Sequence, residues 1–219
     1  MIGLYGGTFD PIHLGHVSIA RLATQALPLS QLIVLPAGNP WQRGRQPLAS
    51  AEARLAMLHL AFDDDAKIII DDRELRRSGP TYTVDTLTEL RHTLGHHVPL
   101  VWLIGADAFA KLDSWHRWQD LFGLTHFAVT PRAGIAAPVM SEQLTTWLAG
   151  REVGLTDLAQ GPSGWFVKLD ITAPPTSSTQ IRGLLAERLP VRGLVPDTVC
   201  DYIEQHHLYS LGKSAFHNG

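Results

Sequence analysis

Cysteine, surplus positive charge and long apolar runs are all scarce in this chain of 219 residues. The single cysteine, Cys200, excludes an internal disulfide, and no neighbouring motif would make it a nucleophile, so we interpret it as a packing thiol. A formal net charge of -3 is against nucleic acid as the main partner, since phosphate-backbone binders usually carry a basic surplus. The apolar runs fall well short of the ~18 residues that suggest a membrane span.

The first residues also lack an export pattern. They show no basic segment followed by an apolar one, so we expect a cytoplasmic protein with no membrane partner. Hydrophobic residues make up 45% of the chain, enough for a sizeable core. We expect a single domain over 1–210, with a C-terminal helical part at about 177–209 and a tail over 211–219. The oligomeric state is open, and a homo-oligomer is compatible with the sequence.

Strand-like and helix-like segments alternate along the chain. Short apolar or β-branched runs bounded by Gly, Pro or Asp predict buried strands at 2–5, 32–35, 67–70, 100–104, 126–130 and 165–169. Apolar residues at i, i+3, i+4 predict helices around 17–27, 84–94, 181–185 and 199–203. This alternation predicts an α/β fold with a parallel sheet covered on both faces, whose ligand lies beyond the carboxyl ends of the strands.

Two stretches interrupt the alternation of predicted strands and helices. Residues 36–49 are rich in Gly, Pro and Arg and predict a long loop, a kind of segment that is often functional in compact domains. Residues 131–164 contain one helical piece at about 141–148 among several glycines. That second stretch is either an insertion or a surface helix, and its role is open.

A motif rich in glycine and histidine follows the first predicted strand. It reads Gly6-Gly7-Thr8-Phe9-Asp10-Pro11-Ile12-His13-Leu14-Gly15-His16. The two glycines let the backbone approach a ligand closely or adopt positive φ. Pro11 disfavours helical backbone at the residue before it, so a helix begins only after this point. His13 and His16 then share one face of that helix, whose start is a natural seat for phosphate oxygens.

Two imidazoles beside a helix start favour charge stabilisation on a polyphosphate, because each can donate a hydrogen bond to an oxygen that gains charge in the transition state. A zinc site is one alternative, but the pattern is not His-Glu-x-x-His and no cysteine cluster accompanies it, so we predict no protein-bound metal. A plain turn with two surface histidines is the other alternative. The density of Gly-Gly, Asp-Pro and paired histidines is against it.

A second motif carries hydroxyl groups just before a predicted helix. It reads Ser177-Ser178-Thr179-Gln180-Ile181-Arg182. An ordinary N-cap explains one hydroxyl but not three. Three hydroxyls, the free N–H groups of a helix start and Arg182 one turn in would form an anion site suited to the β- and γ-phosphates of a nucleotide.

Both motifs resemble the signatures of one superfamily. The first is similar to the Gly-Gly-Thr-Phe-Asp-Pro-x-His-x-Gly-His sequence of the adenylyltransferases that carry a His-x-Gly-His box. The second resembles their Ser-Ser-Thr-x-Ile-Arg box, with Thr176 where relatives are often apolar. This resemblance implies a Rossmann-like, doubly wound, mainly parallel α/β fold with helices on both faces, and adenylyl transfer without a covalent enzyme intermediate.

Further segments resemble the bacterial nicotinate mononucleotide adenylyltransferases. They are 80–87, 104–109, 112–118, 131–134, 194–196, 202–203 and 207–209, and their order and spacing match from residue 2 to about 209. The resemblance implies that the adenylyl group of ATP is joined to nicotinate mononucleotide. The products would be nicotinate adenine dinucleotide (deamido-NAD), an intermediate in NAD biosynthesis, and pyrophosphate, with Mg²⁺ entering on ATP.

The resemblance and the side-chain chemistry together give an expected site. We expect the catalytic residues to be His13, His16 and Arg182. We expect ATP at Gly6, Gly7, Thr8, Phe9, His13, His16, Gly105, Asp107, Ser177, Ser178, Thr179, Ile181 and Arg182. We expect the mononucleotide at Asp10, Asn39, Arg43, Tyr82, Thr83, Trp115 and Arg132. Backbone amides at Thr83 would hold the nicotinate carboxylate, Trp115 would stack on the pyridine ring, and Asp107 would accept from ribose hydroxyls.

The loop after the second predicted strand departs from the relatives, which usually carry Pro-Pro-His-Lys or Pro-Pro-His-Arg there. Here it reads Gly38-Asn39-Pro40-Trp41-Gln42-Arg43-Gly44-Arg45. Either Arg43 or Arg45 would bind the mononucleotide phosphate. The alignment of this loop with the relatives leaves open which of the two it is. The bulky Trp41 would reshape the loop.

Two other functions stay open. One is a transferase of the same superfamily that acts on nicotinamide mononucleotide or phosphopantetheine. The other is a nucleotide-binding sensor without turnover, against which the paired histidines and Arg182 argue. In the expected reaction the mononucleotide phosphate attacks the α-phosphorus in line, so no protein base is needed. The enzyme then contributes positioning and charge stabilisation.

Overall fold

The computed structural model describes residues 1–39, 46–131, 138–171 and 173–210. These residues form a six-stranded sheet in the order β3-β2-β1-β4-β5-β6, in which every neighbouring pair is parallel. The strands are β1 (Ile2–Gly7), β2 (Gln31–Pro36), β3 (Ile68–Ile70), β4 (Leu100–Gly105), β5 (His126–Thr130) and β6 (Phe166–Lys168). Each predicted strand is present, and the order reverses between β1 and β4, which is where such sheets bind ligands.

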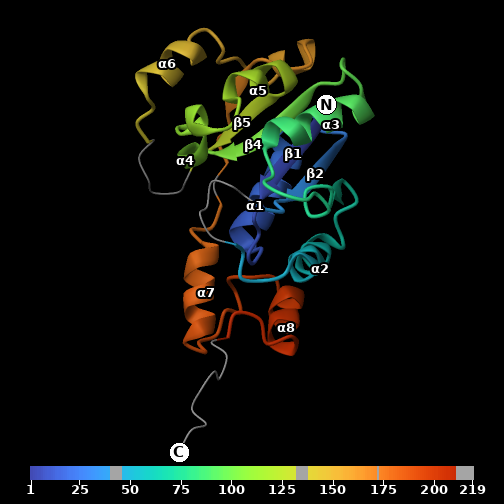
Figure 1. Cartoon of the computed structure of the whole chain (residues 1–219), viewed down its shortest axis with the longest axis vertical. Helices are drawn as coiled ribbons and strands as arrows, with labels where there is room; N and C mark the ends of the chain where they lie inside the picture. Colours follow the sequence, from blue (N-terminus) through green and yellow to red (C-terminus); the bar gives the residue numbers. More distant parts are fainter. Residues whose placement is uncertain (40–45, 132–137, 172, 211–219) are drawn as a thin grey trace, which may run out of the picture.

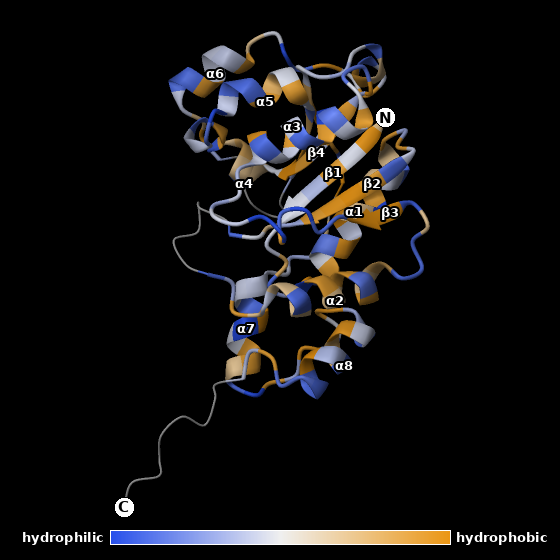
Figure 2. Ribbon diagram, turned by 45° about the vertical axis from the view of Figure 1, so that its right-hand side comes forward, coloured by the Kyte–Doolittle hydropathy of each residue, from blue (hydrophilic) through white to orange (hydrophobic). Residues whose placement is uncertain are grey.

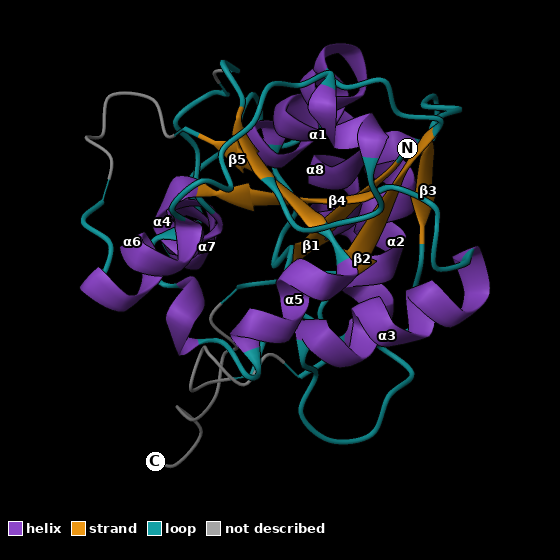
Figure 3. Cartoon of the chain, turned by 90° about the horizontal axis from the view of Figure 1, so that it is seen from above, coloured by secondary structure: helices purple, strands orange, loops and turns teal. Residues whose placement is uncertain are grey.

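Helices cover both faces of the sheet, as predicted, with α1 on one face and α3 and α5 on the other (Figure 3). The helices are α1 (Leu14–Ala26), α2 (Ala51–Phe62), α3 (Thr83–Leu94), α4 (Ala106–Phe109), α5 (Trp118–Leu124), α6 (Glu142–Leu148), α7 (Ser178–Ala186) and α8 (Asp197–Gln205). Short 3₁₀ turns occupy η2 (Leu112–Ser114) and η3 (Asp157–Gln160). The helical piece expected at 141–148 is therefore confirmed as α6. It begins at Ser141, whose hydroxyl accepts from the Leu144 N–H.

The strands contribute side chains to two apolar cores, one on each face of the sheet, because successive side chains point to opposite faces. Leu4 packs toward α3 and α5, whereas Tyr5 packs toward α1 and α2. The strand β2 is coloured almost entirely as apolar in Figure 2, as expected of a strand buried on both faces. The edge strand β3 differs from the prediction of a buried strand, since Ile69 is 45% exposed. An edge strand has a neighbour on one side only, so part of it stays open to solvent.

The helix α2 was not predicted. Its apolar residues surround the helix instead of forming one stripe, which removes the periodic signal. Ser50 caps its start by accepting from the Ala53 N–H at 3.2 Å.

The C-terminal helices α7 and α8 lie beyond the carboxyl end of the sheet, and α8 lies next to α2 (Figure 1). The Thr198 hydroxyl of α8 donates to the Leu60 carbonyl of α2 at 3.1 Å. Ile181, Val199 and Cys200 belong to the same apolar core as α1, so Cys200 is buried in packing, as its sequence context suggested. A continuous core supports the single domain expected over 1–210, which stays a prediction.

Candidate active site

A larger and a smaller cavity lie side by side at the carboxyl ends of β1 and β4. The larger one, about 410 Å³, is lined by the β1–α1 turn, the start of α1, the end of β4 and the segment before α7. The smaller one, about 210 Å³, is lined by the same turn, the end of β4, the start of α3 and Trp115. Both share Tyr5, Gly6, Gly7, Thr8, Gly105 and Ala108. The two cavities therefore meet where the strand order reverses.

Packing explains the glycine pair at this meeting point. A Cβ atom at Gly6 would lie 2.4 Å from Trp102 Cζ2, and one at Gly7 would lie 2.7 Å from Phe9 Cζ. The sequence offered two interpretations, close approach of a ligand or positive φ. Neither glycine has positive φ, so that part was wrong. The glycines are required because aromatic rings occupy the space behind the turn.

The paired histidines stand at the wall of the larger cavity. His13 is the N-cap of α1, and its Nδ1 accepts from the His16 N–H at 3.3 Å. The two rings stack with centroids 3.6 Å apart, which confirms that they share one face. Phe9, held at a φ of 48°, places its ring edge-on to His16 at 5.0 Å. A backbone angle in this left-handed region is costly for a bulky residue, and such strain is concentrated at functional sites.

The hydroxyl-rich segment closes on the same turn. The Ser178 hydroxyl donates to the Pro11 carbonyl at 3.0 Å, and Arg182 donates to the Asp10 carbonyl at 2.6 Å. Ser177 caps α7 by accepting from the Gln180 N–H. The hydroxyl segment contributes Ser177, Ser178 and Thr179 to the lining of the larger cavity. The two motifs, far apart in sequence, thus face one cavity.

Five expected site residues in the described part of the chain are absent from the lining of both cavities. They are Asp10, Ile181 and Arg182, together with Asn39 and Tyr82, which are described below. Ile181 is fully buried in the apolar core, where it anchors α7. Asp10 is 5% exposed, and its carboxylate accepts from the Leu48 and Ala49 N–H groups and the Tyr209 hydroxyl. The structure gives Ile181 and Asp10 positions that support the site from behind. Their predicted contacts with ligand stay predictions.

The smaller cavity has Thr83 and Trp115 in its lining, as the sequence suggested. Thr83 is the first residue of α3, so the positive end of that helix is at the cavity. Tyr82 is not part of the lining and instead packs against His116, with ring centroids 4.3 Å apart.

Glu74 is a lining residue of the smaller cavity that sequence reasoning missed. Its carboxyl group is buried and accepts from the Thr86 hydroxyl at 2.7 Å. Burial raises the pKa of Glu74, against the lowering effects of the Thr86 hydrogen bond and the Arg77 charge. Its sequence context, a run of charged residues after β3, resembles a solvated loop and gave no signal of burial.

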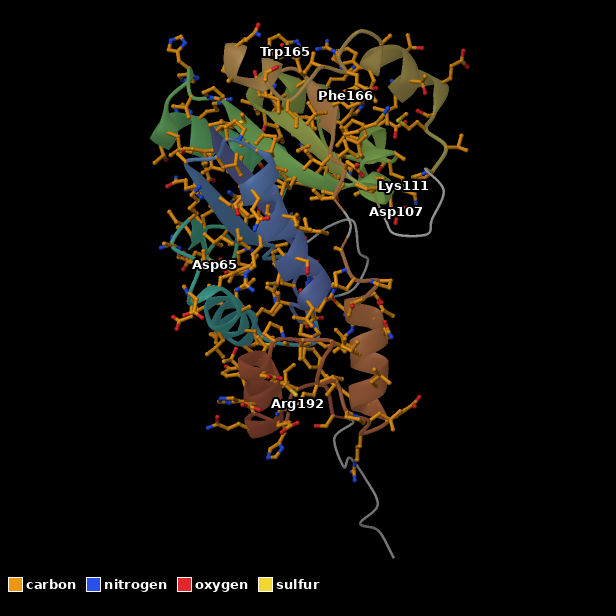
Figure 4. All side chains as sticks on the ribbon, turned by 180° about the vertical axis from the view of Figure 1, so that it is seen from behind. Asp65, Asp107, Lys111, Trp165, Phe166 and Arg192 are labelled. Carbon is orange, nitrogen blue, oxygen red and sulfur yellow. The ribbon has the colours of Figure 1, made fainter. Side chains whose placement is uncertain are left out.

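Asp107 projects from α4 at the end of the sheet nearest α7 (Figure 4) and is part of the lining of the larger cavity.

The backbone carbonyl of Asn39 accepts from the Thr81 N–H at 3.0 Å, and the side-chain oxygen of Asn39 accepts from the Gln46 side chain. Asn39 is not among the lining residues of either cavity. Arg43, Arg45 and Arg132 lie outside the described residues.

Within the described ranges, no group of three or more His, Cys, Asp or Glu side chains is placed to hold a metal ion. None of the helices in that part of the chain is long and apolar enough to cross a membrane.

The comparisons with known proteins agree with this geometry. The cytidylyltransferase-like family model matches residues 4–184. The probable nicotinate-nucleotide adenylyltransferase of Dechloromonas aromatica is 43% identical over 95% of this chain and 97% of its own length. Its counterpart in Pseudomonas aeruginosa is 42% identical over 95% of this chain and 96% of its own length.

The chain belongs to the nicotinate-nucleotide adenylyltransferases of the cytidylyltransferase-like family. A solved structure of the nicotinic acid mononucleotide adenylyltransferase of Plasmodium falciparum, complexed with APC, has the same fold. It superposes with a TM-score of 0.70 over 95% of this chain and 96% of that chain, at 19% identity. The Rossmann-like fold implied by the two motifs is thereby confirmed.

Proposed function

We propose that this nucleotidyltransferase binds ATP in the larger cavity and nicotinate mononucleotide in the smaller one, and joins them at the shared turn. The observation that carries this proposal is the meeting of the two cavities at Gly6, Gly7 and Thr8. A dinucleotide product has two mononucleotide halves linked by a pyrophosphate bridge. Two adjoining cavities with a glycine turn between them match that shape. The product is nicotinate adenine dinucleotide, an intermediate of NAD biosynthesis.

The triphosphate lies between the α1 and α7 starts. Both are helix N-termini, where backbone N–H groups and the helix dipole favour anions. His13 and His16 face the cavity from one side, and Ser178 and Thr179 face it from the other. Asp107 accepts from ribose hydroxyls at the end of β4. In this arrangement the α-phosphate is directed toward the shared turn and the acceptor.

The reaction needs no protein base because the acceptor phosphate is already anionic. Its oxygen attacks the α-phosphorus of ATP in line, a new P–O bond forms, and the bond to the bridging oxygen breaks to release pyrophosphate. The enzyme contributes orientation and charge stabilisation. His16 donates to the α-phosphate as its charge shifts in the transition state. His13 is held beside His16 by stacking and binds the triphosphate with it.

The leaving pyrophosphate is held at α7. Arg182 already has one guanidinium nitrogen on the Asp10 carbonyl and another at 3.2 Å from the Thr179 hydroxyl. Its side chain is 11% exposed, so its charge acts in a partly desolvated setting. Charge-assisted hydrogen bonds of this kind are stronger than neutral ones. Arg182 and the Ser178 and Thr179 hydroxyls thus stabilise the departing β- and γ-phosphates.

The nicotinate half enters the smaller cavity. Its pyridinium ring stacks on Trp115, because an indole face attracts a cationic ring. The backbone N–H groups at the start of α3, near Thr83, receive the nicotinate carboxylate. Asn39, Arg132 and either Arg43 or Arg45 are predicted to contact the mononucleotide.

Mg²⁺ fits this site as a companion of the substrate. Asp107 is the one acidic side chain among the described lining residues of the larger cavity, too few ligands for a cage made by protein alone. Bound to the phosphates, the ion neutralises charge on the oxygens.

Pyrophosphate release tests the function. The purified chain is mixed with ATP, Mg²⁺ and one of three acceptors: nicotinate mononucleotide, nicotinamide mononucleotide or phosphopantetheine. We expect kcat/KM to be highest by a wide margin for nicotinate mononucleotide. Equal or higher values for either other acceptor would assign the chain to the alternative transferase. Absence of pyrophosphate with all three acceptors would indicate a nucleotide sensor.

A further inference from the structure

The carboxylate of Asp10 is fully engaged by the protein itself. Its Oδ2 accepts from the Leu48 N–H at 2.9 Å, and its Oδ1 accepts from the Ala49 N–H at 3.0 Å. The Tyr209 hydroxyl donates to the same Oδ1 at 2.9 Å. Asp10 therefore joins three segments: the glycine–histidine turn, the segment that leads into α2, and the residues after α8.

Tyr209 reaches this carboxylate across 199 residues of sequence. Its ring packs against the core that contains α1, and its backbone adopts a φ of 64°. Burial, followed by the nearby Asp10 charge, raises the pKa of the Tyr209 hydroxyl far above its ordinary value. The hydroxyl therefore keeps its proton and acts as a fixed donor.

The cation Arg182 lies beside this hydrogen-bonded pair. Its guanidinium Nη1 donates to the Asp10 carbonyl at 2.6 Å and lies 3.9 Å from Asp10 Oδ2. The distance to the carboxylate is longer than a hydrogen bond, so the two charges attract without closing a direct contact. The guanidinium is linked to the cavity where the triphosphate is proposed to bind through Thr179, a lining residue whose hydroxyl accepts from Arg182 Nη2 at 3.2 Å.

A second arginine also holds the turn. Arg54 is 2% exposed and donates to the Thr8 carbonyl at 2.8 Å and to the Ala37 carbonyl at 2.7 Å. Ala37 lines the smaller cavity, and Thr8 lines both cavities. Arg54 therefore secures the mononucleotide side of the turn. The ATP side is the one connected to Asp10 and Tyr209.

We propose that Tyr209 and Asp10 are positioning residues that keep Arg182 available to the triphosphate. This inference rests on the proposed function, since it assigns Arg182 to ATP. The Tyr209 hydroxyl and the two N–H groups satisfy the Asp10 carboxylate, so it has little need of the guanidinium. Without that hydroxyl, Oδ1 loses a donor and the carboxylate closes on Arg182 as a direct ion pair. The guanidinium is then withdrawn from the cavity.

The first variant is Tyr209→Phe, which removes only the hydroxyl. We expect kcat/KM for ATP to fall about tenfold, because small displacements of a positioning group cost this much or more. KM for nicotinate mononucleotide should stay unchanged, since Arg54 secures that side. Loss of one hydrogen bond should lower Tm by only about 2–4 °C. Tyr202→Phe is the matched control. Tyr202 packs against His206, and its hydroxyl makes no hydrogen bond to the described residues.

A double variant separates positioning from general stability. Because Tyr209 acts through Arg182, Tyr209→Phe should add no further ATP defect to Arg182→Gln. Additive losses would overturn the proposal, as would unchanged ATP kinetics in Tyr209→Phe. Asp10→Asn provides a second background for Tyr209→Phe. It removes the charge that would capture Arg182, so Tyr209→Phe should then leave ATP binding unaffected.

Calorimetric Kd values for ATP keep this test separate from the test of function. Suppose that Tyr209→Phe weakens ATP binding in the native background but causes no further weakening in the Arg182→Gln background. That result supports the positioning role even if none of the acceptors yields pyrophosphate. A chain that releases pyrophosphate from nicotinate mononucleotide but binds ATP equally well with and without the Tyr209 hydroxyl supports the function and overturns the positioning role.

Discussion

The Ser178 hydroxyl donates to the Pro11 carbonyl at 3.0 Å, although the two residues are 167 positions apart in sequence. This contact brings the start of α7 to the glycine–histidine turn, so that two distant parts of the chain line one cavity. The stacked His13 and His16 rings stand beside it. The chemistry of the site depends on both parts being held at this distance.

Replacement of His16 should remove the contact that strengthens most in the transition state. We expect His16→Ala to lower kcat by about 10²–10³, the range found when one oxyanion donor is lost. Steady-state pyrophosphate release measures this. The control is His97→Ala, an exposed imidazole on the turn after α3, which should leave kcat unchanged. A His16→Ala enzyme with nearly native kcat would remove His16 from the proposed role.

Replacement of Trp115 should affect one substrate only. Trp115→Ala removes the stacking surface of the smaller cavity, so KM for nicotinate mononucleotide should rise about tenfold while KM for ATP stays constant. Trp115→Phe keeps an aromatic face and should recover most of the affinity. Equal effects on both substrates would show that Trp115 supports the fold instead of the nicotinate ring.

The glycine at the turn should be intolerant of even a methyl group. A Cβ at Gly6 would lie 2.4 Å from Trp102, so Gly6→Ala should destabilise the fold by about 1–3 kcal/mol. Urea unfolding measures the change. In the matched control Gly123→Ala, in α5, a Cβ meets no atom within 4 Å, and helix propensity should stabilise the fold by about 0.5–1 kcal/mol. Pairing Gly6→Ala with Trp102→Leu should restore part of the loss, and no recovery would contradict the steric explanation.

The buried Glu74 should make stability depend on pH. Burial raises its pKa in the folded state, so between its ordinary pKa and the raised value the folded protein keeps a proton that the unfolded chain releases. The Glu74 contribution to stability therefore falls as pH rises through that window. Glu74→Gln does not titrate, so its free energy of unfolding relative to the native chain should improve as the pH rises above the ordinary pKa of a glutamate. Urea unfolding across that window measures it, and a constant difference would contradict the raised pKa.

The sequence predicted the parts of this enzyme that depend on local pattern. The buried strands appear as apolar runs, and the paired histidines and the hydroxyls before α7 belong to compact motifs with a chemical reason. The role of His13 as the N-cap of α1 was not predicted. Thr83 was expected at a helix start because α3 has a clear apolar stripe. Each of these signals lies within a few residues of the feature it predicts.

Contacts between residues far apart in the chain could not be predicted from the sequence. Nothing near Asp10 indicates that its partners are Leu48, Ala49 and Tyr209, so a buried anchor was expected to be a ligand contact. Glu74 resembled a loop charge because burial depends on α3 folding over it. The need for glycine at position 6 comes from Trp102 on the neighbouring strand, and only the assembled sheet reveals it.

A crystal structure of the chain with nicotinate adenine dinucleotide is the most direct measurement. We predict the adenylyl half in the larger cavity, with its phosphate between His16 and the start of α7, and the nicotinate ring against Trp115 in the smaller cavity. The pyrophosphate bridge should cross the turn at Gly7 and Thr8. A dinucleotide bound in the reverse orientation, or away from this turn, would contradict the assignment of the two cavities.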